Sequence, residues 1–205
     1  KGLLVEMHNL YEMDDRFIIV GQDDTLDLGG KTLKFYLAPW VHWPDTMFAE
    51  VVEDKVLFTS DFLGTHYASE TLFQNDDLPD YLEAAKRYYS AIMMPFRGSV
   101  REYLELVKTI DPKIIAPSHG PVLQMPAKIV DLYADWASET PKNKVVVAYV
   151  SMHGSTKQMA NFLVDALIQR GIPVNQYNLL DTDSGVLGSA IVDAATIILA
   201  TPTVL

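Results

Sequence analysis

The apolar residues after Pro141 follow an alternating strand and helix pattern. Residues 145–150 form a continuous apolar run, which is typical of a buried parallel strand. The next apolar residues recur every three to four positions and predict an amphipathic helix, with Gly171 as its C-terminal cap. The stripe of this helix is Met159, Phe162, Leu163, Ala166 and Leu167. Strands at 173–179 and 195–200 and a short helix at 187–193 complete the pattern. The βαβαβ order predicts part of a doubly wound parallel sheet.

The residues before Pro141 show a different pattern, in which short apolar runs dominate. These runs predict strands at 17–20, 32–37, 51–52, 56–59 and 113–116. Helical periodicity predicts helices over 79–93 and 100–110. The polar stretch 138–144 separates the two patterns as a linker does, so we expect one domain over 1–140 and another over 141–205.

The second domain contains only three predicted strands. Doubly wound sheets usually have about five strands, with helices on both faces. The chain also begins with Lys1 rather than methionine. We therefore expect it to be an interior piece of a longer protein.

Composition and charge restrict the functional classes. Hydrophobic residues make up 49% of the chain and charged residues 21%, values that are typical of a folded globular protein. The net charge of −11 disfavours binding to nucleic acid or anionic membrane surfaces. No apolar run is long enough to span a bilayer, so we expect a cytoplasmic protein without a nucleic-acid or membrane partner. Because the chain has no cysteine, any metal ion must be held by nitrogen and oxygen donors.

Three residues that can bind a metal ion each follow a predicted strand. They are His42, Asp61 and His119. Side chains at strand ends can converge on one rim of a sheet, and two imidazoles with one carboxylate suit zinc, iron or manganese. The carboxylate can also bridge two ions, with one oxygen on each. The residues alone equally permit a structural interpretation, with a packed histidine, a turn-capping aspartate and a histidine that hydrogen-bonds within its own loop.

The loop Ser151–Thr156 joins a predicted buried strand to a predicted helix. Backbone N–H groups at such a turn can bind a phosphate, and Gly154 allows close approach of the backbone. The loop lacks the lysine of a P-loop and the three glycines of a dinucleotide fingerprint, so a phosphomonoester fits better. Thr201–Thr203 follow the third strand at the same expected edge, which makes FMN a coherent ligand. The alternative is an ordinary Ser/Thr-capped turn.

Six segments together resemble the flavodiiron proteins, also called A-type flavoproteins. They occur in the family's order: 41–46 (VHWPDT), 57–66 (LFTSDFLGTH), 89–96 (YSAIMMPF), 117–121 (PSHGP), 151–156 (SMHGST) and 201–203 (TPT). The combination is specific, whereas no single motif is. The resemblance implies a partial metallo-β-lactamase-like αββα domain over 1–140. A partial flavodoxin-like doubly wound parallel sheet over 141–205 would follow it.

The same resemblance implies a set of site residues. His42 would bind the first iron, His119 the second, and Asp61 would bridge both, while Tyr89 would support these ligands in the catalytic set. Two residues would line or flank the site: Trp43 and His66. The FMN phosphate would contact Ser151, Met152, His153, Gly154, Ser155 and Thr156. The isoalloxazine would lie beside Thr201, Pro202, Thr203, Val204 and Leu205.

By this resemblance we expect an oxidoreductase with FMN and two iron ions that reduces dioxygen to water or nitric oxide to nitrous oxide. Its electrons would come from a reduced donor such as rubredoxin or a reductase, and it would form a head-to-tail homodimer. Two other functions stay open: a zinc hydrolase of the metallo-β-lactamase fold joined to a flavodoxin-like module, and a flavin electron carrier whose first domain is structural. The family's H-x-E-x-D-H cluster, which supplies the other four iron ligands, is absent from the 205 residues, so we expect the fragment alone to be metal-poor and inactive.

Overall fold

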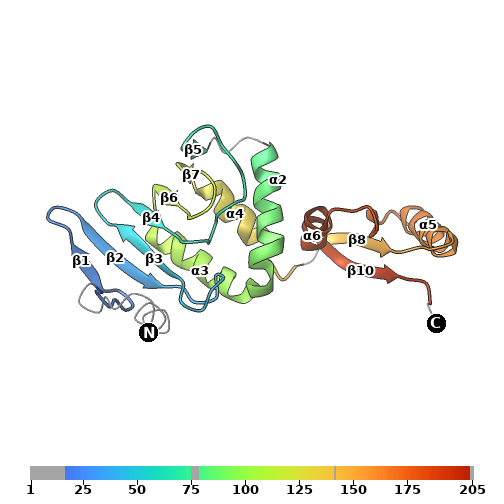
Figure 1. The fold of residues 1–205 in the computed structure, drawn as a ribbon, viewed down its shortest axis with the longest axis horizontal. Coiled ribbons are helices and arrows are strands. Elements are labelled where there is room, and N and C mark those ends of the chain that lie inside the picture. The colour runs from blue at the N-terminus through green and yellow to red at the C-terminus, as the bar shows by residue number, and fades with distance from the viewer. Residues whose placement is uncertain (1–16, 75–78, 141, 204–205) are drawn as a thin grey trace.

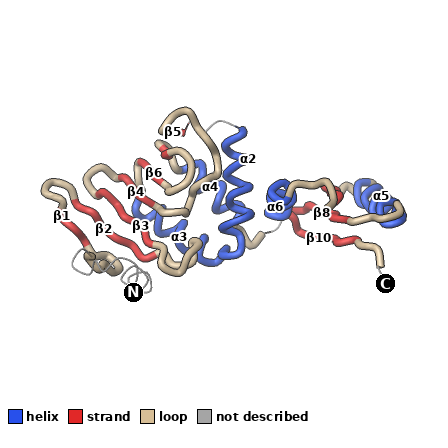
Figure 2. Tube along the Cα trace, in the orientation of Figure 1, coloured by secondary structure: helices blue, strands red, loops and turns tan. Residues whose placement is uncertain are grey.

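The computed structural model describes residues 17–74, 79–140 and 142–203. Its strands form two sheets, one of seven strands and one of three (Figures 1 and 2). The seven-stranded sheet lies within residues 25–123 and the three-stranded sheet within residues 142–200. Val204 and Leu205, which were predicted to lie beside the isoalloxazine, fall outside the described residues.

The larger sheet has the order β1-β2-β3-β4-β6-β7-β5. Its strands are β1 (Thr25–Asp27), β2 (Thr32–Leu37), β3 (Met47–Val51), β4 (Val56–Phe58), β5 (Phe73–Gln74), β6 (Ile114–Ala116) and β7 (Val122–Leu123). Neighbours from β1 to β4 are antiparallel, and β4 pairs with β6 in parallel. Strands β2, β4 and β6 therefore run in the same direction and end at the same edge of the sheet.

Three predicted strands are confirmed in this sheet, and two predictions are corrected. Strands β2, β4 and β6 match the predicted runs at 32–37, 56–59 and 113–116. The run at 51–52 is only the end of β3. Residues 17–20 form no strand, and Ile18 and Ile19 are exposed, because an apolar run becomes a strand only where a neighbouring strand can pair with it.

Helices cover one face of the larger sheet. They are α2 (Pro79–Tyr88), the π-helical turn η2 (Tyr89–Met93), the 3₁₀ turn η3 (Met94–Phe96), α3 (Arg97–Ile110) and α4 (Ala127–Trp136). Both predicted helices are confirmed, and α4 was not among them. The core forms where Phe48 of β3 contacts Phe62 and Tyr103, and Phe62 contacts Tyr133 of α4.

The other face of this sheet is also apolar. The register pairs Leu37 with Met47 and Ala49 with Phe58, so these side chains point to the same face. Leu37, Met47 and Phe58 are exposed large hydrophobic residues. A sheet with apolar residues on both faces is suited to packing against helices on one side and a second sheet on the other, as in an αββα domain.

The smaller sheet is parallel and has the order β10-β8-β9. Its elements are β8 (Lys142–Tyr149), α5 (Ser155–Ile168), β9 (Val174–Asn178), α6 (Ser184–Val192) and β10 (Ala194–Ala200). In chain order this is the 2-1-3 arrangement with which flavodoxin-like sheets begin. The predicted βαβαβ order is confirmed.

The predicted stripe of α5 is only partly correct. Ala160 is buried, and Val164 and Leu167 pack against the same cluster, which includes β8. Met159 and Phe162 are 73% and 78% exposed. Met159 and Phe162 thus lie on a different face of α5 from Ala160, Val164 and Leu167. Contact with the sheet decides which of the two faces is buried.

Helix α6 connects the two sheets by packing on α2 and η2 (Figure 1). Two of its glycines allow this close approach. A Cβ atom at Gly188 would lie 2.8 Å from Ser90 Oγ, and one at Gly185 would lie 2.7 Å from the Arg87 guanidinium. The backbone of α6 therefore lies almost in contact with these side chains, and larger residues at the two positions would push it away.

Charged pairs also link the smaller sheet and α6 to helices α2 and α4. Lys86 of α2 contacts Asp193, which directly follows α6. Lys142 at the start of β8 also contacts Asp193, at 3.2 Å, and reaches Asp135 of α4 at 2.6 Å. Burial opposes ionisation of Asp193, but the hydrogen bonds and charges of the two lysines lower the pKa of its carboxyl group. These contacts hold the smaller sheet in one orientation relative to α2 and α4.

Candidate metal centre and flavin loop

His42, Asp61 and His119 come from three loops at one edge of the larger sheet. Strands β2, β4 and β6 run in the same direction, and each of these residues follows the end of one of them. The loop from β2 contains a tight turn in which the Trp40 N–H donates to the Trp43 carbonyl at 2.8 Å. The expected convergence at one sheet edge thus follows from strand direction.

Backbone hydrogen bonds hold the Asp61 and His119 loops together. The Ser118 N–H donates to the Ser60 carbonyl at 2.7 Å, and the Thr65 N–H donates to the His119 carbonyl at 3.2 Å. Gly120 has a φ of +81°, and a Cβ atom there would lie 2.6 Å from the Thr65 side chain. Only glycine allows both this backbone conformation and this close contact.

The Asp61 carboxylate lies between the two imidazoles. Its Oδ2 is 3.2 Å from His42 Nε2, and its Oδ1 is 3.2 Å from His119 Nε2. The Asp61 side chain is 20% exposed, so the carboxylate is accessible from one side. Each imidazole therefore faces a different carboxylate oxygen.

This arrangement does not surround a single ion position. Within the part of the chain that the structure describes, no group of three or more His, Asp or Glu side chains is arranged to hold one metal ion. The geometry around Asp61 instead provides two separate nitrogen and oxygen pairs. Imidazole nitrogen and carboxylate oxygen are donors that suit non-haem iron and zinc.

Tyr88 contacts the main chain of Asp61 itself. Its hydroxyl donates to the Asp61 main-chain carbonyl at 2.9 Å. Burial and the nearby Asp61 charge raise the pKa of Tyr88 well above its usual value, so its hydroxyl remains a donor. His66 packs edge-on against the rings of Tyr88 and His119, with centroids 4.8 and 5.7 Å apart.

Tyr89, which was predicted to support the ligands, packs elsewhere. Its ring contacts Tyr133 and Trp136, with centroids 5.2 and 5.5 Å apart. Consecutive helical residues point about 100° apart, so only one of the pair Tyr88 and Tyr89 can face Asp61. The sequence carries no signal that selects Tyr88 over Tyr89, because the choice depends on how the helix is rotated against the Asp61 loop.

Aromatic residues flank the site at His42. The Trp43 ring lies 5.9 Å from the His42 ring, and the Phe96 ring lies 6.4 Å from it. Trp40 stacks on Phe96 at 6.3 Å. Trp40 and Trp43 are 51% and 61% exposed. The turn from Trp40 to Trp43 thus presents two large apolar side chains to solvent beside His42.

The loop Ser151–Thr156 forms a turn before α5. Gly154 has a φ of +88°, and the Ser151 hydroxyl accepts hydrogen bonds from the N–H groups of Gly154 and Lys157 at 3.1 and 3.3 Å. The N–H groups of Ser155 and Thr156 are the first two of α5, and such groups have no partner within their own helix. The loop therefore retains donors for an anion, although Ser151 occupies two others.

Thr201–Thr203 lie beside this loop. Strand β10 pairs with β8, and the Val150 N–H donates to the Ala200 carbonyl at 2.9 Å, next to Thr201. The two loops predicted to bind FMN are therefore neighbours at the carboxyl edge of the smaller sheet, which is where ligands of open α/β sheets bind.

Residues 3–120, more than half of the chain, match the family described as ODP family beta lactamase. The chain belongs to this family. The matched residues include all three candidate metal ligands, His42, Asp61 and His119.

The chain is similar to a nitric oxide reductase, a flavodiiron protein and a rubredoxin oxygen:oxidoreductase. It is 35% identical to the nitric oxide reductase of Moorella thermoacetica, over 94% of this chain and 49% of that protein. The flavodiiron protein from Giardia intestinalis aligns with a TM-score of 0.89 and 29% identity, over 100% of this chain and 51% of that one. The rubredoxin oxygen:oxidoreductase of Desulfovibrio gigas aligns with a TM-score of 0.86 and 28% identity, over 96% and 51%.

These similarities confirm the predicted resemblance to flavodiiron proteins and the predicted fold class. The ODP-family chain spans about half the length of the curated relatives it matches. Within residues 17–74, 79–140 and 142–203, no helix is both long and apolar enough to cross a bilayer.

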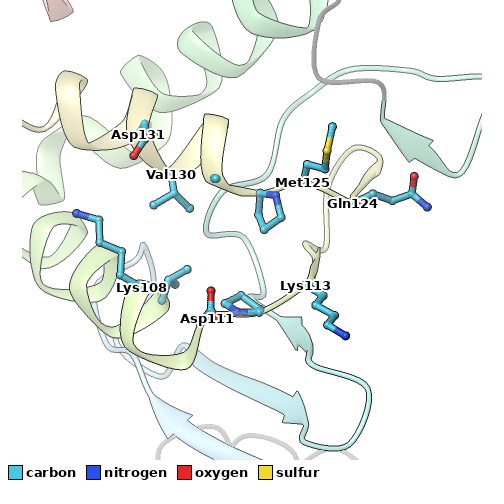
Figure 3. Close-up of a pocket in the computed structure, with 11 residues that line it drawn as sticks. Lys108, Asp111, Lys113, Gln124, Met125, Val130 and Asp131 are labelled. Carbon is cyan, nitrogen blue, oxygen red and sulfur yellow. The ribbon is translucent and has the colours of Figure 1, made fainter.

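A cavity of about 580 Å³ in the ODP-family chain lies away from both candidate sites (Figure 3). Val107, Val130 and Pro126 provide apolar lining, and Lys108 and Lys113 lie at its margin. Lys113 directly precedes β6, whereas His119 follows it, so the cavity is at the opposite end of that strand. No residue predicted for the metal or flavin site lines it.

Proposed function

We propose that this chain is part of a flavodiiron oxidoreductase that uses FMN and two iron ions to reduce dioxygen to water or nitric oxide to nitrous oxide. The single observation that carries the proposal is the Asp61 carboxylate, whose two oxygens face His42 and His119 separately at 3.2 Å. A carboxylate placed in this way is suited to bridging two ions. The names of the similar proteins supply the two candidate substrates.

In this proposal His42 holds one iron, His119 holds the other, and Asp61 contributes one oxygen to each. When bound, the iron pair and FMN supply the electrons for reduction of the diatomic substrate. The described residues supply no further ligand to either ion, so each iron needs additional donors.

We assign the supporting role that was predicted for Tyr89 to Tyr88. Its hydroxyl donates to the Asp61 carbonyl, and the raised pKa keeps the proton on the tyrosine oxygen. This hydrogen bond fixes the backbone that carries the bridging carboxylate. Groups that orient ligands in this way commonly change metal affinity by about 10- to 100-fold when removed.

FMN is proposed to bind where the Ser151–Thr156 loop and Thr201–Thr203 meet. The N–H groups of Ser155 and Thr156 and the positive end of the α5 dipole favour its phosphate. Thr156 is buried and Ser155 is exposed, so the Ser155 hydroxyl is the more accessible of the two to the phosphate.

A second copy of the chain is proposed to bring its flavin to this metal site. Strands β8 and β10 run away from the larger sheet, so their carboxyl ends and the flavin loops lie at the far end of the molecule (Figure 1). The contacts of α6 with α2 hold this orientation. In a head-to-tail homodimer, the flavin of one chain would lie near the metal site of the other. Electrons would enter FMN from a reduced donor such as rubredoxin or a reductase.

The charge distribution supports a head-to-tail arrangement. The net charge of −11 lies entirely in residues 1–140, whereas residues 141–205 contain four basic and four acidic residues. Two acidic halves would repel each other, but an acidic half next to a neutral one would not.

Metal and flavin analysis of the full-length protein, purified without oxygen, tests the proposal. We expect about two irons and one FMN per chain. One zinc per chain would favour the hydrolase, and FMN without metal would favour the electron carrier; either result would contradict the proposal.

A substitution of Asp61 separates the metal site from the flavin site. Asp61→Ala should abolish reduction of dioxygen or nitric oxide, while the flavin is still reduced by its donor. The matched control is Asp131→Ala, which removes an exposed carboxylate from α4 beside the cavity of Figure 3. Unchanged turnover in the Asp61 variant would refute the bridging role.

A further inference from the structure

Phe96 lies at a break in the helical layer, next to His42. Helix α2 continues into the π-helical turn η2 (Tyr89–Met93) and the 3₁₀ turn η3 (Met94–Phe96) before α3 begins at Arg97. π-Helical turns are rare and frequently mark functional sites. Phe96 is also the N-cap residue of α3, with a φ of −105° and a ψ of 28°, and its side chain makes no capping hydrogen bond.

The stability of α3 does not explain a phenylalanine at this position. N-cap positions favour Ser, Thr, Asp and Asn, whose side-chain oxygens accept hydrogen bonds from the first N–H groups of a helix. A phenylalanine side chain has no atom that can do this. A position that breaks a local rule is expected to serve a functional site or a contact elsewhere in the fold. The reason for Phe96 must therefore lie in what its ring contacts.

The Phe96 ring packs against the loop that carries His42. It stacks on Trp40, with centroids 6.3 Å apart and an interplanar angle of 17°, and its centroid lies 6.4 Å from that of the His42 ring. The Trp43 ring also lies near His42, but it belongs to the same loop and is 61% exposed. Phe96 comes from the helical layer instead, so its ring can fix the His42 imidazole relative to the rest of the domain.

Packing matters here because His42 has few polar contacts. A metal-binding histidine commonly donates its second ring N–H to a carboxylate or a backbone carbonyl, which fixes the ring orientation. In the part of the chain that the structure describes, the only polar side-chain contact of His42 is that of its Nε2 with Asp61, at 3.2 Å. The orientation of the imidazole plane therefore depends on its ring contacts.

We propose that Phe96 is a positioning residue for the candidate metal centre, because its ring holds the His42 imidazole at the angle at which Nε2 faces Asp61. The inference rests on the proposed function, in which His42 is an iron ligand. The same helical segment carries Tyr88, whose hydroxyl donates to the Asp61 carbonyl at 2.9 Å. The break between α2 and α3 thus lets one segment support both the Asp61 backbone and the His42 ring.

The two imidazoles have different aromatic neighbours, so the two ions can be tested separately. His119 lies against the rings of His66 and Tyr88, whereas His42 lies against Phe96. In the full-length protein, Phe96→Ala should lower the affinity for one iron by about 10- to 100-fold, as loss of a group that orients a ligand commonly does. The affinity for the other iron should not change. Anaerobic titration with an iron chelator measures both affinities, and the Mössbauer spectrum shows which iron site is altered.

Further variants separate positioning from loss of packing. Phe96→Tyr keeps the ring and should keep both irons at wild-type affinity. Phe96→Leu keeps most of the apolar volume without a ring, and it should show the selective loss even if Phe96→Ala does not fold. Phe162→Ala removes an exposed phenylalanine from α5 as the matched control and should change neither affinity.

The outcomes distinguish this inference from the function on which it rests. Unchanged affinity for both irons in Phe96→Leu, or an equal loss of both, overturns the positioning role. If the wild-type protein itself does not hold two irons, it is the proposed function that fails.

Discussion

Replacing Gly188 with alanine tests the packing of α6 on the larger unit. The added methyl group would lie 2.8 Å from Ser90 Oγ, closer than any ordinary contact. Ser90 cannot simply rotate without cost, because its hydroxyl donates to the Arg87 carbonyl at 2.9 Å. Overpacking of this kind typically costs about 1–3 kcal/mol, whereas glycine to alanine within a helix gains up to about 1 kcal/mol.

The expected net effect is a loss of about 0–3 kcal/mol in the free energy of unfolding. Gly98→Ala in α3 is the matched control, because nothing lies within 4 Å of a Cβ atom at that position. It should be neutral or stabilising by up to about 1 kcal/mol. The two variants should therefore differ by about 1–3 kcal/mol in urea unfolding followed by tryptophan fluorescence and circular dichroism.

A double-mutant cycle isolates the contact. Ser90→Ala removes the Oγ atom and leaves the Cβ atom 3.4 Å away from the new methyl group, which is tolerable. Gly188→Ala should then cost at least about 1 kcal/mol less in the Ser90→Ala background than in the wild type. If the two substitutions are additive, or if Gly188→Ala is as favourable as Gly98→Ala, α6 does not pack on Ser90 in this way.

Three further predictions concern other contacts. Asp193→Asn should cost about 1–2 kcal/mol at neutral pH, because it weakens two partly buried lysine contacts. The pKa of Asp193 is lowered in the folded state, so its contribution to stability is present above the unfolded value of about 3.9 and is lost as the pH falls through the lower folded value. As the pH is lowered below about 5, the urea midpoint should therefore fall more steeply in the wild type than in the variant. Tyr88→Phe should lower stability by about 0.5–1.5 kcal/mol through loss of the hydroxyl bond to Asp61, and calorimetry that finds no loss would contradict that bond. Gly120→Ala should cost at least about 1 kcal/mol because of its positive φ and the Thr65 contact, and an unchanged melting temperature would refute this close approach.

Much of the fold could be predicted from local pattern. Strand and helix periodicities located β2, β4, β6 and the whole βαβαβ unit, because a segment's own apolar spacing shows which of its faces can be buried. The same logic failed at residues 17–20 and at Met159, where apolar residues remain exposed. Burial there depends on whether another element packs against the segment.

The candidate site was predictable in part. Three residues after three strands were expected to meet, and strand direction alone accounts for their shared edge. The choice between Tyr88 and Tyr89 was not predictable, because it depends on the rotation of α2 against the Asp61 loop.

By itself, the sequence determined the positions of β2, β4, β6 and the βαβαβ unit, which residues follow these strands, and the uneven distribution of charge between the two halves. These properties are local or additive along the chain. Only the tertiary structure decided that each Asp61 oxygen faces a different imidazole, that α6 lies against Ser90, and that the candidate flavin loops point away from the candidate metal centre. Those features depend on contacts between residues far apart in the chain, and the geometry of such contacts is settled when the elements pack.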